Sequence, residues 1–125
     1  MTVLLSIKPE FAEKIFNGTK KYEFRKSIFK RTDVHKIIVY ASSPVKKVIG
    51  EFTIEDILND NLDAIWDKTA VSSGISKGFY MAYFENKSKA YAIKIGRTKR
   101  YKQARELSDY NVHTAPQSFA YLAES

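Results

Sequence analysis

Lys20, Glu23 and Arg25 have the residue types and the spacing of a binding site or a proton-transfer site. Segment 20–26 alternates polar and apolar residues, which predicts a strand, so Glu23 and Arg25 leave the same face about 6–7 Å apart at the backbone. Arg25 there offers a planar fork to a phosphate or a base edge, and Glu23 can accept a hydrogen bond from an exocyclic amine. The simpler alternative is an ion pair on a half-exposed strand, which the spacing alone favours.

Two lysines lie on either side of the predicted helix that precedes this strand. The alternation places Lys20 with Tyr22 and Phe24, on the face opposite to Glu23. Lys8 comes just before the helix and Lys20 just after it. Either could be an ordinary solvated lysine, as most lysines are.

Local patterns predict the elements that must position these side chains. A strand over 3–8 leads into a helix over 9–16, because Pro9 suits a first helical position and Gly18 follows the apolar stripe. Further strands are expected over 36–41, 45–57, 90–95 and 118–122, with Gly50 as a bulge or a point of close approach. Asp60 and Ser76 are candidate caps of two more helices. Their expected inward faces hold Leu62, Ile65, Trp66 and Thr69 in the first, and Phe79, Ala82 and Tyr83 in the second.

The motif around Lys20 extends in both directions. Gly18, Lys20, Glu23 and Arg25 fill every fixed place of the pattern G-x-K-x-x-E-x-R after a helix. Three further blocks follow in order: Tyr-Ala-Ser-Ser-Pro at 40–44, Gly-Glu-Phe at 50–52 and Pro-Gln-Ser-Phe at 116–119. Together they resemble the ASCH domain, a branch of the PUA-like superfamily of small β-barrels that is usually linked to RNA or modified nucleosides.

The resemblance covers nearly the whole chain and implies one domain over 1–125. Its expected fold is α+β, a PUA-like small β-barrel of about five to six strands with two to three short helices packed on it. It also implies that the polar residues of the motif line the barrel mouth, which favours a cleft over a simple ion pair. If the chain is an enzyme, the proton-handling pair would be Lys20 and Glu23.

The candidate residues for binding a ligand or nucleic acid come from the motif blocks and from a second basic segment. They are Lys8, Lys20, Glu23, Arg25, Ser42, Ser43, Glu51, Lys99, Arg100, Tyr101, Gln117 and Ser118. Several have simpler explanations. Glu51 is equally well an edge residue or a second acid of the cleft, Ser42 and Ser43 are typical turn residues, and a strand end explains Gln117 and Ser118.

The charge is strongly positive and gathered in two segments. The chain of 125 residues has a formal charge of +7, with +5 over 20–31 and +6 over 94–105. Such clusters fit a polyanion-binding face, although lysines on strand edges also serve solubility. Within the second segment, Tyr101 is the best candidate for an exposed aromatic ring on which a base could stack.

Composition excludes several other classes. There is no cysteine, and His35 and His113 are too few for a convincing metal cluster, so we expect neither a metal nor another cofactor. No apolar run approaches a membrane span or a signal peptide, so we expect a soluble, cytoplasmic protein without a membrane partner. Protein partners cannot be read from the sequence.

Three functions remain. The first is a noncatalytic module that binds RNA, or a modified nucleotide or nucleoside, through a basic cleft at the barrel mouth. The second is a small hydrolase of amidohydrolase or ribonuclease type acting on a modified nucleoside or RNA, and the third is a regulatory interaction domain. Some ASCH proteins deacylate N4-acetylcytidine with the motif lysine, a threonine three residues later and a distant glutamate. Here Glu23 stands at the threonine position, so the resemblance implies no such deacetylation.

Overall fold

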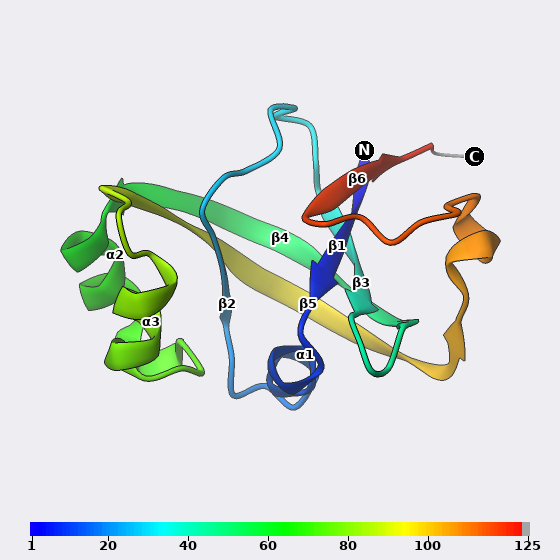
Figure 1. Ribbon diagram of the computed structural model, residues 1–125, viewed down its shortest axis with the longest axis horizontal. Coiled ribbons are helices and arrows are strands. Elements are labelled where there is room, and N and C mark those ends of the chain that lie inside the picture. Colours follow the sequence, from blue (N-terminus) through cyan, green and yellow to red (C-terminus); the bar gives the residue numbers. More distant parts are fainter. Residues whose placement is uncertain (124–125) are drawn as a thin grey trace.

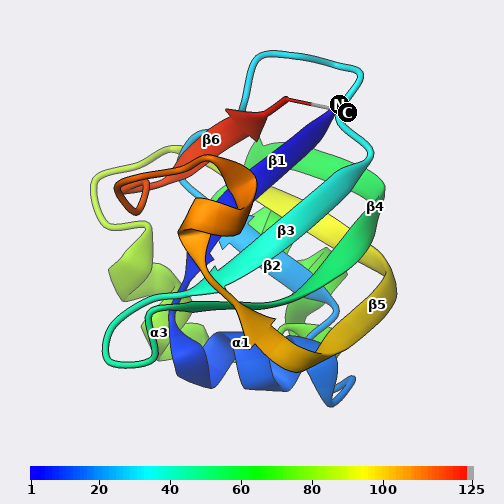
Figure 2. The same ribbon diagram turned by 90° about the vertical axis from the view of Figure 1, so that its right-hand side faces the viewer.

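Strand pairing joins the two ends of the chain in a single mixed sheet. The computed structural model describes residues 1–123. Six strands pair in the order β2-β5-β4-β3-β1-β6, with β1 and β3 parallel and the other neighbours antiparallel. Their bounds are β1 Thr2–Ile7, β2 Tyr22–Arg25, β3 Lys36–Ala41, β4 Lys47–Asn61, β5 Lys89–Arg105 and β6 Phe119–Leu122. The sheet curls on itself, as Figures 1 and 2 show.

Three α-helices and two short 3-10 turns complete the fold of residues 1–123. The helices are α1 Pro9–Phe16, α2 Leu62–Thr69 and α3 Lys77–Tyr83, and the 3-10 turns are Ala70–Ser72 and Leu107–Tyr110. Helix α1 covers one end of the curled sheet, and α2 and α3 lie together beside it (Figure 1). The expected α+β, barrel-like sheet with short helices is therefore confirmed. No helix in the described part of the chain is both long enough and apolar enough to cross a bilayer.

The core lies on both faces of the sheet. Side chains of β1, β3 and α1, among them Val3, Leu5 and Ile15, fill the inside of the curl. Leu4 and Ile38 point to the outer face, where the segment after β5 covers them with Leu107 and other apolar side chains. A third cluster packs α2 and α3 on β2 and β5. Burial on both faces explains why β1 and β3 are nearly continuous apolar runs.

The two helices inserted between β4 and β5 differ in detail from the sequence prediction. Ser76 caps α3 as predicted, accepting a hydrogen bond from Phe79 N at 3.0 Å. The cap of α2 is Asn61 rather than the predicted Asp60, because β4 continues to Asn61. The Asn61 Oδ1 accepts a hydrogen bond from Ala64 N at 2.9 Å. Tyr80 is the buried residue of α3, whereas Phe79, which we expected inside, is 40% exposed.

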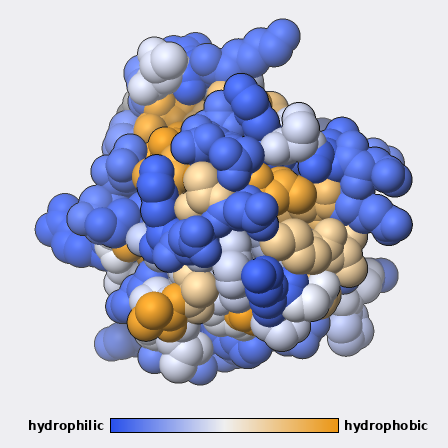
Figure 3. Space-filling view, turned by 90° about the vertical axis from the view of Figure 1, so that its left-hand side faces the viewer, coloured by the Kyte–Doolittle hydropathy of each residue, from blue (hydrophilic) through white to orange (hydrophobic). Residues whose placement is uncertain are grey.

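The face of the molecule on the α2 and α3 side is mostly hydrophilic. Figure 3 shows its apolar surface divided into small areas between polar and charged side chains. Val71 and Phe79 are among the exposed large apolar residues. Scattered apolar residues of this kind are normal on a protein surface and do not by themselves mark an interface.

Strands β4 and β5 are longer than predicted and form a ribbon that curves around the fold. The predicted strand over 45–57 extends to Asn61, and the one over 90–95 extends to Arg105. Gly50 is the predicted point of close approach, since a Cβ there would lie 2.5 Å from Phe16 Cζ and 2.6 Å from the Lys99 carbonyl oxygen. The pairing of β4 and β5 also shifts between Val48 and Gly50, as expected of a bulge.

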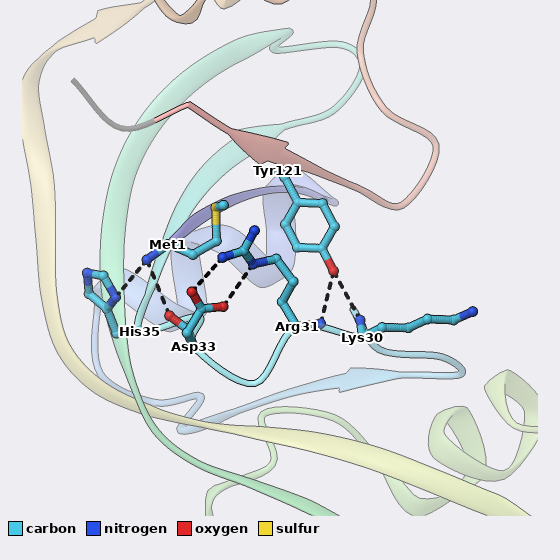
Figure 4. Close-up of polar contacts among 6 residues, drawn as sticks. All are labelled: Met1, Lys30, Arg31, Asp33, His35 and Tyr121. Carbon is cyan, nitrogen blue, oxygen red and sulfur yellow. Dashed lines mark hydrogen bonds and ion pairs between the residues drawn. The ribbon is translucent and has the colours of Figure 1, made fainter.

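The connection between β2 and β3 is attached to both ends of the chain. The Tyr121 hydroxyl of β6 accepts hydrogen bonds from the backbone N–H groups of Lys30 and Arg31 at 3.1 and 3.2 Å (Figure 4). The Met1 ammonium donates to the Asp33 carbonyl oxygen at 3.2 Å and lies 3.2 Å from His35 Nδ1. These contacts hold the connection against β1 and β6.

Candidate functional site

A pocket of about 710 Å³ opens between α1, α3, the start of β2 and the segment before β6. Seven of the twelve candidate residues from the sequence line it, and they are Lys8, Lys20, Glu23, Arg25, Ser42, Ser43 and Gln117. They come from four separate stretches of the chain. The fold thus brings together most of the motif blocks. The volume of the pocket is typical of small-ligand sites.

Lys20 is the most buried cation of the pocket. Its side chain is 2% exposed, and its Nζ donates to the Ser73 carbonyl oxygen at 2.8 Å. The same Nζ lies 4.8 Å from the ring centroid of Phe24 and 5.4 Å from that of Phe11. Burial lowers the pKa of Lys20 to about 8, against the opposing effect of the Glu23 carboxylate. A lysine in this state can exchange a proton near neutral pH.

The strand alternation was wrong about where Lys20 points. Lys20 precedes β2, and its backbone N–H still bonds the Lys14 carbonyl oxygen at the end of α1. The alternation of side chains along a strand therefore does not apply to Lys20. Lys20 and Glu23 line the same pocket instead of opposite faces of a strand.

Glu23 and Arg25 form an ion pair that is buried in the pocket wall. Arg25 Nη1 lies 3.1 Å from Glu23 Oε2, and the two side chains are only 12% and 8% exposed. Arg25 also donates to the Ser6 carbonyl oxygen at 3.3 Å and to Ser118 Oγ at 2.6 Å. Burial raises the pKa of Glu23, while the nearby Arg25 and Lys20 charges oppose this. The ion pair of the simpler interpretation is therefore present, but it is buried in the wall of the pocket and does not lie on a half-exposed strand.

One carboxylate oxygen of Glu23 remains open to the pocket. Within residues 1–123 its Oε2 accepts from Arg25, and its Oε1 accepts no hydrogen bond. Every fully buried side-chain nitrogen or oxygen in that range has a partner, so Oε1 must retain access to the pocket space. An acceptor that faces the pocket without a protein partner favours a ligand that donates a hydrogen bond.

Ser118 contacts the site indirectly. Its hydroxyl accepts from Arg25, and it is not among the residues that line the pocket. It therefore holds the guanidinium in place, whereas the sequence suggested a direct hydrogen bond to a ligand. Gln117, its neighbour, does line the pocket.

The other four candidates lie outside the pocket. Glu51 accepts a hydrogen bond from Tyr101 Oη at 2.9 Å, and it lies near Lys36. Tyr101 is only 8% exposed, and the Arg105 guanidinium carbon lies 3.7 Å from the centroid of its ring. The prediction of an exposed stacking ring was therefore wrong. Lys99 and Arg100 are exposed on β5. Tyr101 is buried because the segment after β5 folds back over it.

Sequence reasoning missed the apolar and imidazole parts of the pocket. Its walls also carry Phe11, Phe24, Phe79, Tyr83, Lys46 and His113. The aromatic residues read as ordinary core in the sequence, and no local pattern connects His113 with the motif. In the described part of the chain, no cluster of three or more His, Cys, Asp or Glu side chains could hold a metal ion.

Comparison with known proteins decides the family. The family model described as "ASCH domain" matches residues 5–99, most of the chain and all of the central motif. The chain belongs to the ASCH domain family. The predicted resemblance is thereby confirmed.

Two curated proteins are similar to this ASCH domain in sequence. It is 36% identical over 124 residues to a protein named large ribosomal subunit protein uL22 from Ureaplasma parvum, covering 97% of this chain and 39% of that protein. It is also 36% identical over 90 residues to the ASCH domain-containing ribonuclease of Zymomonas mobilis, covering 72% of this chain and 61% of that protein. The chain thus spans about two fifths of the uL22 relative.

A solved structure agrees with the fold. The crystal structure of ASCH from Zymomonas mobilis superposes with a TM-score of 0.89 at 29% identity, covering 98% of this chain and 88% of that chain. The N-terminal domain of McrB from Staphylothermus marinus is more distant, with a TM-score of 0.53 at 16% identity, and shares the fold alone.

Proposed function

We propose that this ASCH domain binds RNA, or a modified nucleotide, by taking one unpaired nucleotide into the pocket. The observation that carries the proposal is Glu23 Oε1, which within residues 1–123 accepts no hydrogen bond and faces a pocket that has two buried cations and aromatic walls. A base inserted there has N–H groups for the carboxylate and carbonyl or ring acceptors for the Lys20 ammonium.

The pocket walls suit a flat ligand. Phe11, Phe79 and Tyr83 contribute aromatic surface on the side of α1 and α3. Unpaired bases are commonly bound by stacking on such rings, which is worth about 1–3 kcal/mol per base. At the rim, Lys8 and Lys46 are exposed cations that suit a phosphate. The ligand would thus enter base first.

The relatives support the same class of ligand. One relative from Zymomonas mobilis is named an ASCH domain-containing ribonuclease, a name that indicates RNA as its substrate. The solved ASCH structure from Zymomonas mobilis shares the fold of this chain.

The test is a binding titration with nucleoside monophosphates and with a short unstructured RNA at low and moderate salt. We expect RNA affinity to fall steeply with salt because phosphate contacts release counterions. Glu23→Gln keeps the shape of the side chain and should weaken binding about tenfold, since a charged acceptor is lost. Glu51→Gln is the matched control outside the pocket and should bind as wild type does. Undetectable binding at low salt, or equal binding by Glu23→Gln and wild type, would contradict the proposal.

A second function, RNA cleavage, is favoured by one specific observation. Burial moves the pKa of Lys20 down to about 8 and the pKa of Glu23 up, in the same pocket. Opposite shifts of this kind are typical of groups that exchange protons during a reaction. In that case Lys20 and Glu23 are the proton-handling pair of a ribonuclease.

Incubation with end-labelled RNA separates binding from cleavage. The ribonuclease hypothesis requires defined cleavage products from wild type and none from either Lys20→Met or Glu23→Gln. Stable protein–RNA complexes without cleavage products would support RNA binding and contradict the ribonuclease hypothesis.

A further inference from the structure

We infer that a bound RNA strand continues from the pocket along the outer end of β5, on a surface here named the basic ribbon. The basic ribbon comprises residues 97–105, with the exposed cations Arg97, Lys99, Lys102 and Arg105. The inference rests on the proposed function, since the strand must first place a nucleotide in the pocket.

The cations of the basic ribbon are available to phosphates. In the part of the chain that the structure describes, Lys94 pairs with Glu55, and Arg100 pairs with Glu13. Arg97, Lys99 and Lys102 have no acidic side chain within ion-pair distance there. Single-stranded nucleic acids bind to rows of such unpaired charges.

The sheet leaves this part of β5 open. Strand β2 pairs with β5 only over Tyr91–Lys94, so beyond Lys94 the sheet supplies a neighbour, β4, on one side only. Except for Tyr101, every residue of the basic ribbon is exposed, and residues 99–105 line a shallow depression together with Asp109. Because a strand rises about 3.4 Å per residue, the basic ribbon is about 27 Å long, enough for several nucleotides.

The pocket and the basic ribbon meet at the turn between β3 and β4. Lys46 lines the pocket, the next residue contacts Glu106 at the end of β5, and Val48 pairs with Arg105 in the sheet. Two residues of chain therefore separate the pocket rim from the near end of the basic ribbon. A strand that leaves the pocket over Lys46 passes Glu106 before it reaches Arg105, and Asp109 also lines the depression that it enters.

The experiment compares the affinity for a mononucleotide with the affinity for an unstructured RNA of about ten nucleotides, a length within the usual site sizes of single-strand binders. The test variant is Arg97→Gln/Lys99→Gln/Lys102→Gln, which spares Arg105 because it packs on Tyr101. The matched control is Lys68→Gln/Lys87→Gln/Lys89→Gln, which removes the same charge from exposed lysines around α2 and α3.

We expect the ribbon variant to bind the mononucleotide as wild type does and to bind the longer RNA at least about tenfold more weakly at low salt. Its salt slope for the longer RNA should fall by about 2–3, one for each lost phosphate contact. The control variant should change either affinity by less than about twofold, since its lysines lie off the proposed path.

Three results would overturn the inference while leaving the pocket assignment intact. In the first, wild type binds the longer RNA no more tightly than the mononucleotide. In the second, the ribbon variant keeps the full gain in affinity that wild type shows for the longer RNA. In the third, the ribbon variant and the control variant lose affinity equally. The second result would mean that the cations changed in the ribbon variant protect an exposed strand edge from pairing with other chains. If the wild type binds neither the mononucleotide nor the longer RNA, the proposed function itself fails.

Discussion

Arg25 joins the two edge strands of the sheet by donating from Nη2 to Ser118 Oγ at 2.6 Å. Arg25 ends β2, and Ser118 directly precedes β6, the strand at the opposite edge in the sheet order. The same guanidinium bonds the Ser6 carbonyl oxygen on β1 and pairs with Glu23. One side chain thus closes the curled sheet and fixes the carboxylate of the pocket.

The first prediction is that Arg25→Ala destabilises the protein by about 3 kcal/mol, because Glu23 would remain buried without its partner. The double variant Arg25→Ala/Glu23→Gln should recover part of this loss. Urea unfolding measures both, with Arg100→Ala as the control, since its exposed pair with Glu13 should contribute about 0–1 kcal/mol. An Arg25→Ala variant as stable as Arg100→Ala would show that the buried pair contributes nothing.

The second prediction concerns pH and Lys20. In the folded chain the pKa of Lys20 is lowered from 10.5 to about 8, so the folded chain releases this proton at a lower pH than the unfolded chain does. Between these two values the unfolded state binds more protons, so the contribution of Lys20 to stability rises with pH. The unfolding free energy of wild type should therefore gain about 2–3 kcal/mol relative to Lys20→Met from pH 8 to pH 10.5. The comparison removes the contributions of the groups that the two proteins share. A difference that stays constant over this range would contradict the lowered pKa.

The third prediction compares two glycines. Gly50→Ala should cost about 1–3 kcal/mol, because the new Cβ would lie 2.6 Å from the Lys99 carbonyl oxygen, a backbone atom that cannot move aside freely. Gly78→Ala on α3 should instead stabilise by about 0.5–1 kcal/mol, because the new Cβ would lie 4.0 Å from Ser76 Oγ, an ordinary contact. Thermal or urea unfolding gives both signs. A tolerated Gly50→Ala would mean that β4 and β5 do not approach this closely at Gly50.

The fourth prediction is that Tyr101 contributes to stability and not to RNA binding. Tyr101→Phe removes the hydrogen bond to Glu51 and should cost about 1 kcal/mol. Its RNA affinity should equal that of wild type, because the ring lies beneath Arg105 and offers little surface to a base. A selective loss of RNA affinity at unchanged stability would restore the stacking role that the sequence suggested.

Local chemistry in the sequence determined the elements nearest the motif. Pro9 and the Asn17-Gly18 pair predicted the bounds of α1, which the structure reproduces at Pro9–Phe16. The strand over 36–41 and the cap at Ser76 are likewise present as predicted. Each signal lies within a few residues of what it predicts, and the tertiary packing at these places agrees with it.

Only the tertiary structure decided which side chains share the pocket. Lys20 meets the Ser73 carbonyl oxygen across 53 residues of sequence, and Arg25 meets Ser118 across 93. His113 reaches the same pocket from the segment that follows β5. The strand period failed at Lys20, where the chain is not yet a strand, and the expectation of an exposed Tyr101 failed because a later segment covers its ring. Such contacts depend on how the sheet curls and what packs on it, and no local pattern of residues encodes that arrangement by itself.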